Sequence, residues 1–235
     1  MKKRYRYHTA AVGIAAILVY SMMFTIVSSK ESTGEAMEET YSLPAPHLAG
    51  KVTVEQALNE RRSVRSFRNE PLTLEALSQL LWAAQGITDA RGYRTAPSAG
   101  ALYPLDVYVV AGKVTGLPPG VYAYEPRGHR LRLVRAGDHR RELSSAALGQ
   151  SCVESGAIAL VFSAVYERVT GKYGARGERY AHIEAGHAAQ NVFLQAVSLD
   201  LGTVVVGAFR DDAVNDVIGM KDKTAPLYIM PVGVK

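Results

Sequence analysis

The stretch ERYAHIEAGHAAQNVFLQAVSLDL, Glu178 to Leu201, predicts the helix around which this fold is built. It contains no proline, and its apolar residues recur at nearly every angle of a helical wheel rather than along one stripe. A helix with that pattern is buried on most of its sides, so we expect this one to lie in the core. A strand is expected directly after it, over Thr203–Val206, where three valines lead into Gly207.

The rest of the chain mixes helix and strand patterns. Thr53 and Gln56 form a capping-box pattern for a helix over Val54–Glu60, and leucines at helical spacing predict another over Thr73–Gln85. Two further helices are expected, from Asp138 to near Gly149 and over Asp211–Ile218. The other expected strands are Leu105–Ala111, Val121–Tyr124, Leu131–Arg135, Ala157–Val165 and Leu227–Val232. A hairpin within such a mixture favours an α+β fold over regular βαβ winding.

Composition excludes several classes of protein. The chain has 235 residues, 48% of them hydrophobic, which suits one globular domain with a sizeable core. The net charge of +5 arises within residues 1–30, because the remaining 22 basic residues balance all 22 acidic ones. No basic excess is left to indicate nucleic-acid binding. The single cysteine, Cys152, excludes a disulfide within the chain and a cysteine-based zinc cluster.

The N-terminal sequence predicts membrane attachment. Residues 9–29 carry no charge and follow a basic start, which is typical of one membrane-spanning helix with the body of the protein outside the cytoplasm. A cleaved signal peptide and a secreted product are the alternative. Residues 30–49 are polar and proline-punctuated, so we expect a flexible linker there and a folded domain over 50–235.

Familiar catalytic motifs are absent. The AGKVTG segment around Lys113 lacks the first glycine of a P-loop, and Ser98 lies in APSAG rather than in a nucleophile elbow. His182 and Glu184 point about 200° apart on a helix, so we expect no metal site there.

Four segments do not look like plain scaffold. RRSVRSF, Arg61–Phe67, crowds three arginines and two serines together, a set that can grip a phosphate, although a solvated basic turn is the simpler alternative. RTAPSAGALYP, Arg94–Pro104, is a small-residue loop that lets backbone approach a flat ligand. VVVGAF, Val204–Phe209, ends a strand at a glycine, and TGKYGARGERY, Thr170–Tyr180, reads as a glycine-softened loop. Each of these has a purely structural alternative, but together, in this order, they carry weight.

Over about Val52–Gly233 this set resembles the nitroreductase family of flavoproteins, and more closely its SagB-type dehydrogenase branch, which includes azoline oxidases. The resemblance implies an α+β fold with a mixed, mostly antiparallel sheet flanked by helices around a long core helix. It also implies FMN held non-covalently at the interface of an interleaved homodimer. Carried onto this chain, Arg61, Arg62, Ser63 and Arg65 would hold the phosphate and ribityl chain. The loop residues Pro97, Ser98, Ala99 and Ala101 would lie along the flavin ring and ribityl chain, mostly from the other subunit. The flavin ring would be faced by Val205, Val206, Gly207 and Ala208. Near the C-terminus only Lys235 is left to reach the phosphate.

Lys172 and Tyr173 match the Lys-Tyr pair of the azole-forming oxidases. A lysine could take the proton from a substrate carbon while hydride leaves for flavin N5, and a tyrosine could orient it. The resemblance therefore implies an FMN-dependent dehydrogenase of a peptide or small heterocycle. Two alternatives stay open: an NAD(P)H-dependent nitro or quinone reductase, and a membrane-tethered flavin-binding module without activity.

Overall fold

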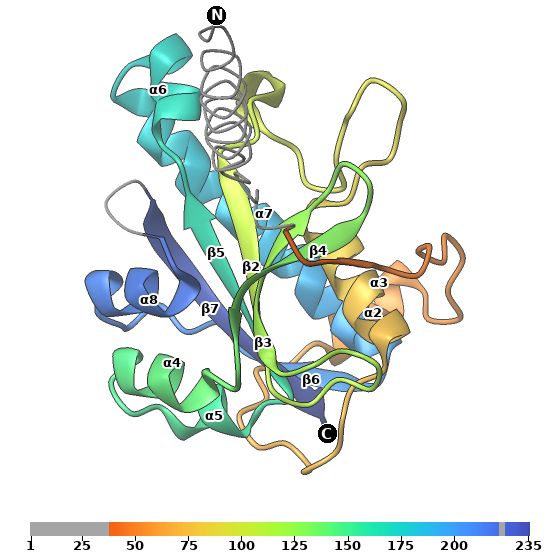
Figure 1. The fold of residues 1–235 in the computed structure, drawn as a ribbon. Helices are drawn as coiled ribbons and strands as arrows, with labels where there is room; N and C mark the ends of the chain where they lie inside the picture. Colours follow the sequence, from red (N-terminus) through yellow and green to blue (C-terminus); the bar gives the residue numbers. More distant parts are fainter. Residues whose placement is uncertain (1–37, 221–223) are drawn as a thin grey trace, which may run out of the picture. The chain divides into compact units, whose positions relative to one another are not determined.

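The computed structural model describes residues 38–220 and 224–235, in which seven strands form one sheet (Figure 1). The strand order is β1-β4-β3-β2-β5-β7-β6, and every neighbouring pair is antiparallel. The strands are β1 Thr40–Ser42, β2 Leu105–Ala111, β3 Gly120–Glu125, β4 Arg130–Ala136, β5 Ile158–Ala164, β6 Leu201–Thr203 and β7 Ala225–Val234.

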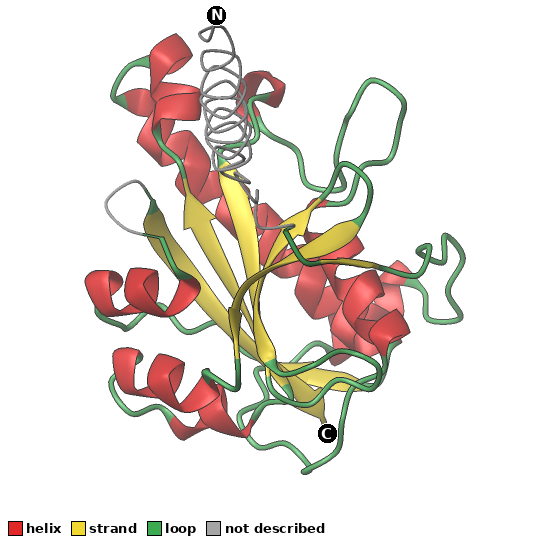
Figure 2. Ribbon diagram, viewed as in Figure 1, coloured by secondary structure: helices red, strands yellow, loops and turns green. Residues whose placement is uncertain are grey.

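Helices cover both faces of this sheet (Figure 2). They are α2 Val54–Glu60, α3 Leu74–Gln85, α4 Arg140–Ala146, α5 Ser151–Ser155, α6 Glu167–Tyr173, α7 Arg176–Ser198 and α8 Asp211–Ile218, with a 3-10 turn at Ala99–Ala101. Leu160 and Phe162 of β5 pack in the cluster that α3 and α7 share, whereas Ala159 and Val161 face the cluster of α4, α5 and α8. Because successive strand residues point to opposite faces, β5 is buried on both.

The α+β prediction is confirmed, and several boundaries agree closely. The predicted strand at Leu105–Ala111 and the predicted helices at Val54–Glu60 and Asp211–Ile218 match β2, α2 and α8. Thr53 accepts the Gln56 N–H at 3.1 Å, as a helix N-cap does. The Gln56 side chain instead donates to Glu60 at 2.9 Å, so only half of the capping box forms.

Two segments are more ordered than predicted. The expected loop 170–180 is helical, because α6 runs to Tyr173 and α7 starts at Arg176 after a single turn at Gly174, whose φ is 57°. The expected flexible linker at 30–49 is structured over its second part, since β1 pairs with β4. Leu43 is buried, and Ser78 donates to the Pro44 carbonyl at 2.6 Å. The described fold therefore includes residues well before Gly50.

The predicted membrane attachment is corrected. Across the described ranges, 38–220 and 224–235, no helix is long and apolar enough to cross a bilayer. The longest of them, α7, spans 23 residues but carries Arg176, Glu178, Arg179 and Glu184. The stretch 9–29, from which the anchor, its extracytoplasmic orientation and the secreted alternative were predicted, lies outside the described residues. We therefore do not retain a membrane assignment.

The RRSVRSF segment lies along the edge of the sheet at β6 and β7. Val64 donates its N–H to the Thr203 carbonyl at 2.9 Å, and Arg68 donates to Val234 at 2.9 Å. Two glycines make this approach possible. A Cβ on Gly202 would lie 2.7 Å from Val64 Cγ1, and one on Gly233 would lie 2.7 Å from Phe67 Cβ. The arginine segment is thus fixed by backbone bonds and close packing.

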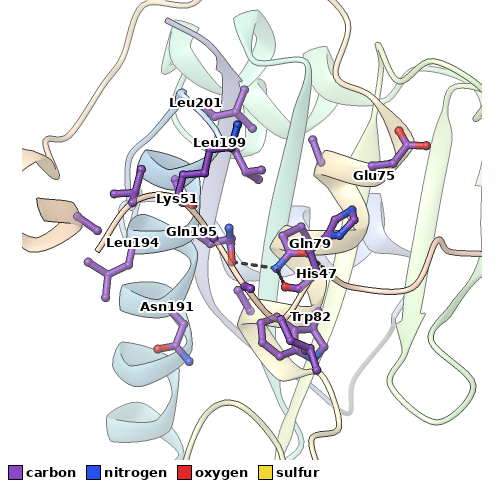
Figure 3. Close-up of a pocket in the computed structure, with 18 of the residues that line it drawn as sticks. His47, Lys51, Glu75, Gln79, Trp82, Asn191, Leu194, Gln195, Leu199 and Leu201 are labelled. Carbon is purple, nitrogen blue, oxygen red and sulfur yellow. Dashed lines mark hydrogen bonds between the residues drawn. The ribbon is translucent and has the colours of Figure 1, made fainter. Parts of the chain in front are cut away.

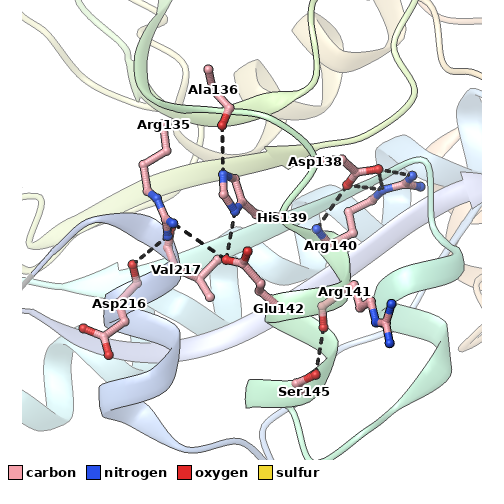
Figure 4. Close-up of polar contacts among 10 residues, drawn as sticks. All are labelled: Arg135, Ala136, Asp138, His139, Arg140, Arg141, Glu142, Ser145, Asp216 and Val217. Carbon is pink, nitrogen blue, oxygen red and sulfur yellow. Dashed lines mark hydrogen bonds and ion pairs between the residues drawn. The ribbon is translucent and has the colours of Figure 1, made fainter.

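A polar cluster at the end of β4 ties α4 to α8 (Figure 4). Arg135 donates to the carbonyls of Asp216 and Val217, at 3.0 and 3.2 Å, and forms a 3.8 Å ion pair with Glu142. Both carbonyls lie in the last turn of α8, where a helix leaves acceptors free, and the Asp216 carbonyl also accepts the Gly219 N–H at 3.4 Å. Arg135 therefore adds a side-chain donor at this helix end.

We expect Arg135→Ala to lower the free energy of unfolding by about 1 kcal/mol, the usual contribution of such hydrogen bonds. Urea unfolding measures this change. Arg141→Ala is the matched control, because the Arg141 side chain is exposed on α4, next to Glu142, and lies in no ion pair within the described ranges. An equal loss in both variants would contradict the assigned role of Arg135.

Candidate functional site

Lys172 and Tyr173 lie against the predicted flavin loop. A Cβ built on Gly100 would lie 2.8 Å from Tyr173 Oη and 3.0 Å from Lys172 Nζ, so the two polar groups meet at this glycine. The Lys172 ammonium also lies 5.4 Å from the centre of the Tyr173 ring. Tyr180 packs edge-on against Tyr173, with ring centres 5.1 Å apart. A helix end and a loop, predicted separately from sequence, therefore form one cluster.

The loop itself has unusual backbone geometry. Gly100, Ala101 and Tyr103 have φ values of 62°, 54° and 47°, in the left-handed region that non-glycine residues seldom adopt. Such conformations cost free energy and persist only where surrounding contacts impose them. Here the Ser98 hydroxyl accepts the Tyr103 N–H at 2.9 Å and closes the turn from inside. Pro97, Gly100 and Ala101 are exposed, which leaves the outer surface of the loop open to a ligand.

The predicted phosphate-binding arginines lie in three different environments. Arg61 packs over the Phe193 ring of α7, 5.1 Å from its centre. Arg62 folds back and donates to the carbonyls of Asn59 and Arg61, at 2.9 and 2.7 Å, which completes the end of α2. Arg65 is exposed. Within the described part of the chain none of the three forms an ion pair, so their charges remain available to an anion.

The predicted ring-facing segment follows β6. Val206 exchanges backbone hydrogen bonds with Ile229 of β7, at 2.8 and 2.9 Å, which holds Val205–Ala208 beside the sheet. Gly207 and Ala208 are exposed, and the Ala208 carbonyl accepts a hydrogen bond from the Gln150 side chain at 3.0 Å.

Lys235, the residue after β7, pairs with Asp200 at 2.9 Å. This ion pair holds the pKa of the Asp200 carboxyl below its usual value.

The arginine segment and the Lys172–Tyr173 cluster lie at opposite ends of the sheet, whereas Val206 pairs with Ile229 near the middle of β7. Ser63 lies beside Thr203, near the end of β7. The 97–101 loop and α6 lie where β2 begins and β5 ends (Figure 1). The seven residues of β2 span about 20 Å between these ends. One chain therefore does not bring Arg61 to the Lys172–Tyr173 pair.

A hollow lies elsewhere, between α3, α7 and the segment around His47 (Figure 3). Its volume is about 860 Å³. The backbone of His47 both donates to and accepts from the Gln79 side chain, which also donates to Gln195 at 3.1 Å. None of the predicted site residues is among those that line this hollow.

Glu184 is a buried polar residue whose position the sequence did not reveal. It is 2% exposed on α7 and accepts a hydrogen bond from Gln85 at 3.3 Å. Arg94 donates to Gln85 at 2.9 Å and lies over the Tyr103 ring, 4.4 Å from its centre. Burial raises the pKa of Glu184, and the nearby Ser98 hydroxyl, the Gln85 amide and the charge of Arg94 oppose that rise. The sequence offered one signal for this burial, since Glu184 stands on a side of the core helix that is otherwise lined by alanines.

Glu184 has a predictable effect on stability. Because its pKa is higher in the folded chain than in the unfolded one, the folded state binds more protons between those two values. Stability from this group therefore falls as pH rises from about 4.5 through the raised pKa. We expect the melting temperature of Glu184→Gln, relative to the unmodified protein, to increase across that window. A difference that stays constant with pH would contradict the raised pKa.

Comparisons with known proteins identify the family of this fold. A family model described as "Nitroreductase family" matches residues 58–234. MJ1384 of Methanocaldococcus jannaschii, a nitroreductase by name, is 46% identical over 85% of this chain and 99% of its own length. A solved structure from Ralstonia eutropha, also titled a nitroreductase, superposes with a TM-score of 0.74 at 33% identity over 84% of this chain and 90% of that one.

Two more distant relatives have names that indicate activities. The microcin B17-processing protein McbC of Escherichia coli is 29% identical over 69% of this chain, but the match spans only 62% of McbC. The FMN reductase (NADPH) of Bacillus subtilis is 28% identical over 77% of this chain and 65% of its own length. The matching family model and the shared fold together show that this chain belongs to the nitroreductase family of flavin oxidoreductases.

Proposed function

We propose that the protein is an FMN-dependent dehydrogenase of the SagB type, acting on a peptide or small heterocyclic substrate. The observation that carries this proposal is the meeting of Lys172 and Tyr173 at Gly100. A base and a hydroxyl held over a flavin-binding loop suit removal of a proton from substrate carbon. The similarity to McbC, which is named as a peptide-processing protein, supports the peptide class.

The residues present fit FMN. Arg61 and Arg65 offer positive charge that no acidic side chain within the described ranges neutralises, as a phosphate site requires. The exposed loop with left-handed Gly100 and Ala101 offers backbone to a flat ring. Two predicted contacts are less suited. The Ser98 hydroxyl accepts the Tyr103 N–H, and the Lys235 ammonium is paired with Asp200.

A composite site would need two copies of the chain. Because the arginine segment and the Lys172–Tyr173 cluster lie about 20 Å apart along the sheet, each would meet its counterpart from a second copy. This distance supports the homodimer that the resemblance implies. Lys172 and Tyr173, at the end of α6, contact Gly100 of the same chain, so they would reach the flavin from the same subunit as the Pro97–Ala101 loop.

The chemistry divides between protein and cofactor. Bound FMN would supply the hydride acceptor, at N5. In its neutral form, Lys172 would take the proton that leaves the neighbouring substrate atom, and Tyr173 would orient the substrate by a hydrogen bond. An azoline loses one hydride and one proton in this way and becomes an azole, so electrons and atoms balance. The exposed Gly207 and Ala208 amides would lie near the ring edge.

An NAD(P)H-dependent reductase is the second candidate. The relative named FMN reductase (NADPH) supports it, since 28% identity extends over 77% of this chain. Such an enzyme would take hydride from nicotinamide and pass it to a nitro or quinone compound. It would have no need for Lys172 as a base.

Mixing the enzyme with each candidate electron donor under anaerobic conditions distinguishes the dehydrogenase from the reductase. The full-length protein loaded with FMN is mixed in a stopped-flow instrument with a thiazoline-containing peptide, and separately with NADPH. We expect the flavin absorbance to bleach with the peptide, at a rate that falls when Lys172 is replaced. Bleaching by NADPH alone would favour the reductase, and failure to bind FMN would refute both proposals.

A further inference from the structure

The ring-facing segment, residues 205–208, leaves the sheet directly after Val206. The Val206 carbonyl accepts the Ile229 N–H at 2.9 Å. Because the C=O and N–H of one trans peptide unit point in opposite directions, the N–H of Gly207 points away from β7. A Cβ on Gly207 would have no atom within 4 Å other than those of its chain neighbours. Within the described ranges the N–H groups of Gly207 and Ala208 donate to no other residue, so this exposed segment offers two free donors.

Gln150 binds the other side of this segment to the end of α4. Its side-chain Nε2 donates to the Ala208 carbonyl at 3.0 Å and to the Ala147 carbonyl at 3.1 Å. Both partners are acceptors, so the atom between them is the amide nitrogen, and both of its protons are used. Since the Val206 and Ala208 carbonyls are both bound, the peptide unit between Gly207 and Ala208 is held from either side.

Arg210 supplies a second attachment to the same helix end. Its N–H donates to the Ala146 carbonyl at 3.0 Å, and its guanidinium donates to the Ser145 carbonyl at 3.2 Å. Both carbonyls belong to the last turn of α4, where a helix leaves acceptors free. The end of α4 therefore holds the chain at two successive points.

The backbone of Gln150 is itself fixed. Its carbonyl accepts the hydroxyl of the buried Ser144 at 3.0 Å, and its N–H donates to the Ala147 carbonyl at 3.2 Å. The two residues before it, Leu148 and Gly149, have φ values of 59° and 77°. Leucine seldom adopts this left-handed conformation, and such strain persists only where surrounding contacts impose it. The tight turn returns the chain to the end of α4, where the Gln150 side chain reaches the ring-facing segment.

We propose that Gln150 is a positioning residue, which fixes the Ala208 carbonyl against α4 and thereby aims the free amides of Gly207 and Ala208 at the flavin ring. This inference rests on the proposed function for the identity of the ligand, but the geometry of the segment can be tested without flavin. Gln150 acts through the backbone, because both protons of its amide are used by carbonyls of the chain.

NMR relaxation of the backbone amides in the full-length protein without flavin gives the first test. We expect order parameters of about 0.85 for the Gly207 and Ala208 amides, as in rigid backbone, and of less than about 0.6 in Gln150→Ala. Gln150→Met, which keeps the length of the side chain but donates no proton, should have the same effect. Ser145→Ala is the control, because it removes only a hydroxyl that bonds to the Arg141 carbonyl, and it should leave both amides rigid. Rigid amides in Gln150→Ala and Gln150→Met would overturn the proposal.

The reduction potential of bound FMN, measured against a redox dye, gives the second test. Flavin N5 accepts a hydrogen bond when oxidised but carries a proton once reduced, so an N–H aimed at it favours the oxidised form. We expect Gln150→Met to reduce this preference about tenfold, which raises the two-electron potential by about 30 mV. The same potential in Gln150→Met, Ser145→Ala and the unmodified protein would overturn the aiming of the amides. If the unmodified protein bound no FMN, the proposed function would fail, and the relaxation measurements would still decide whether Gln150 holds the segment.

Discussion

Replacing Lys172 with alanine is expected to lower kcat for dehydrogenation by about 100-fold or more, the usual contribution of a general base. The reason is geometric, since Lys172 Nζ and Tyr173 Oη are the two polar groups that meet at Gly100 of the exposed loop. Lys172 is exposed and forms no ion pair within 38–220 and 224–235, so its removal should not disturb folding. Steady-state kinetics with the FMN-loaded protein measures the effect.

Variants of Tyr173 and Lys172 should differ in how strongly they lower kcat. Tyr173→Phe retains the ring that packs against Tyr180, 5.1 Å away, and removes only the hydroxyl. We expect it to lower kcat less than Lys172→Ala does, with FMN affinity unchanged in both variants. Full activity in Lys172→Ala would exclude Lys172 as the base. Loss of FMN along with activity would instead indicate a structural role for this cluster.

Arg61→Ala is expected to weaken FMN binding by about 10- to 100-fold, as removal of one charge-assisted hydrogen bond predicts. Arg61 is held over Phe193, so its guanidinium is already oriented before an anion arrives. Fluorescence titration of the full-length protein measures the change. The effect should be larger than that of Arg62→Ala, because Arg62 spends hydrogen bonds on the carbonyls of Asn59 and Arg61.

Arg127→Ala provides the matched control for charge. Arg127 is exposed in the turn between β3 and β4, and its replacement by alanine removes one positive charge, as Arg61→Ala does. It should leave FMN affinity unchanged. If Arg61→Ala and Arg127→Ala weakened binding equally, the effect would come from net charge, and the RRSVRSF segment would lose its assigned role.

Most helices and strands were predicted correctly because each is indicated by residues within its own segment, such as a helix cap or an apolar run. Thr53 caps α2 as the sequence indicates, and the helix predicted from Thr73 begins one residue later, at Leu74. The apolar run of β5 is buried on both faces. The 170–180 segment was misread because glycine was taken as a loop signal. Gly171 is instead accommodated inside α6, with no other atom near the position of its missing Cβ. Only Gly174, at the end of that helix, needs a positive φ.

Tertiary partners could not be inferred in the same way. Glu184 was noticed only as a possible metal ligand, and its hydrogen bond from Gln85 joins residues 99 positions apart. The meeting of Lys172 with Gly100 depends on where β5 ends relative to β2. The separation of Arg61 from that cluster has the same origin. Sequence order alone does not tell which end of a sheet each segment occupies.

The central claim is that one flavin site combines the arginine segment of one copy of the chain with the Lys172–Tyr173 pair of another copy. Co-expression of Arg61→Ala and Lys172→Ala chains with different tags allows the mixed dimer to be purified. One of its two sites would then hold both substitutions and the other neither. We predict about half the activity of the unmodified dimer, because the symmetric dimer has two equivalent sites. The assay uses an FMN concentration that leaves the Arg61→Ala homodimer largely without flavin. Activity of the mixed dimer no higher than that of the Arg61→Ala and Lys172→Ala homodimers would then contradict the composite site.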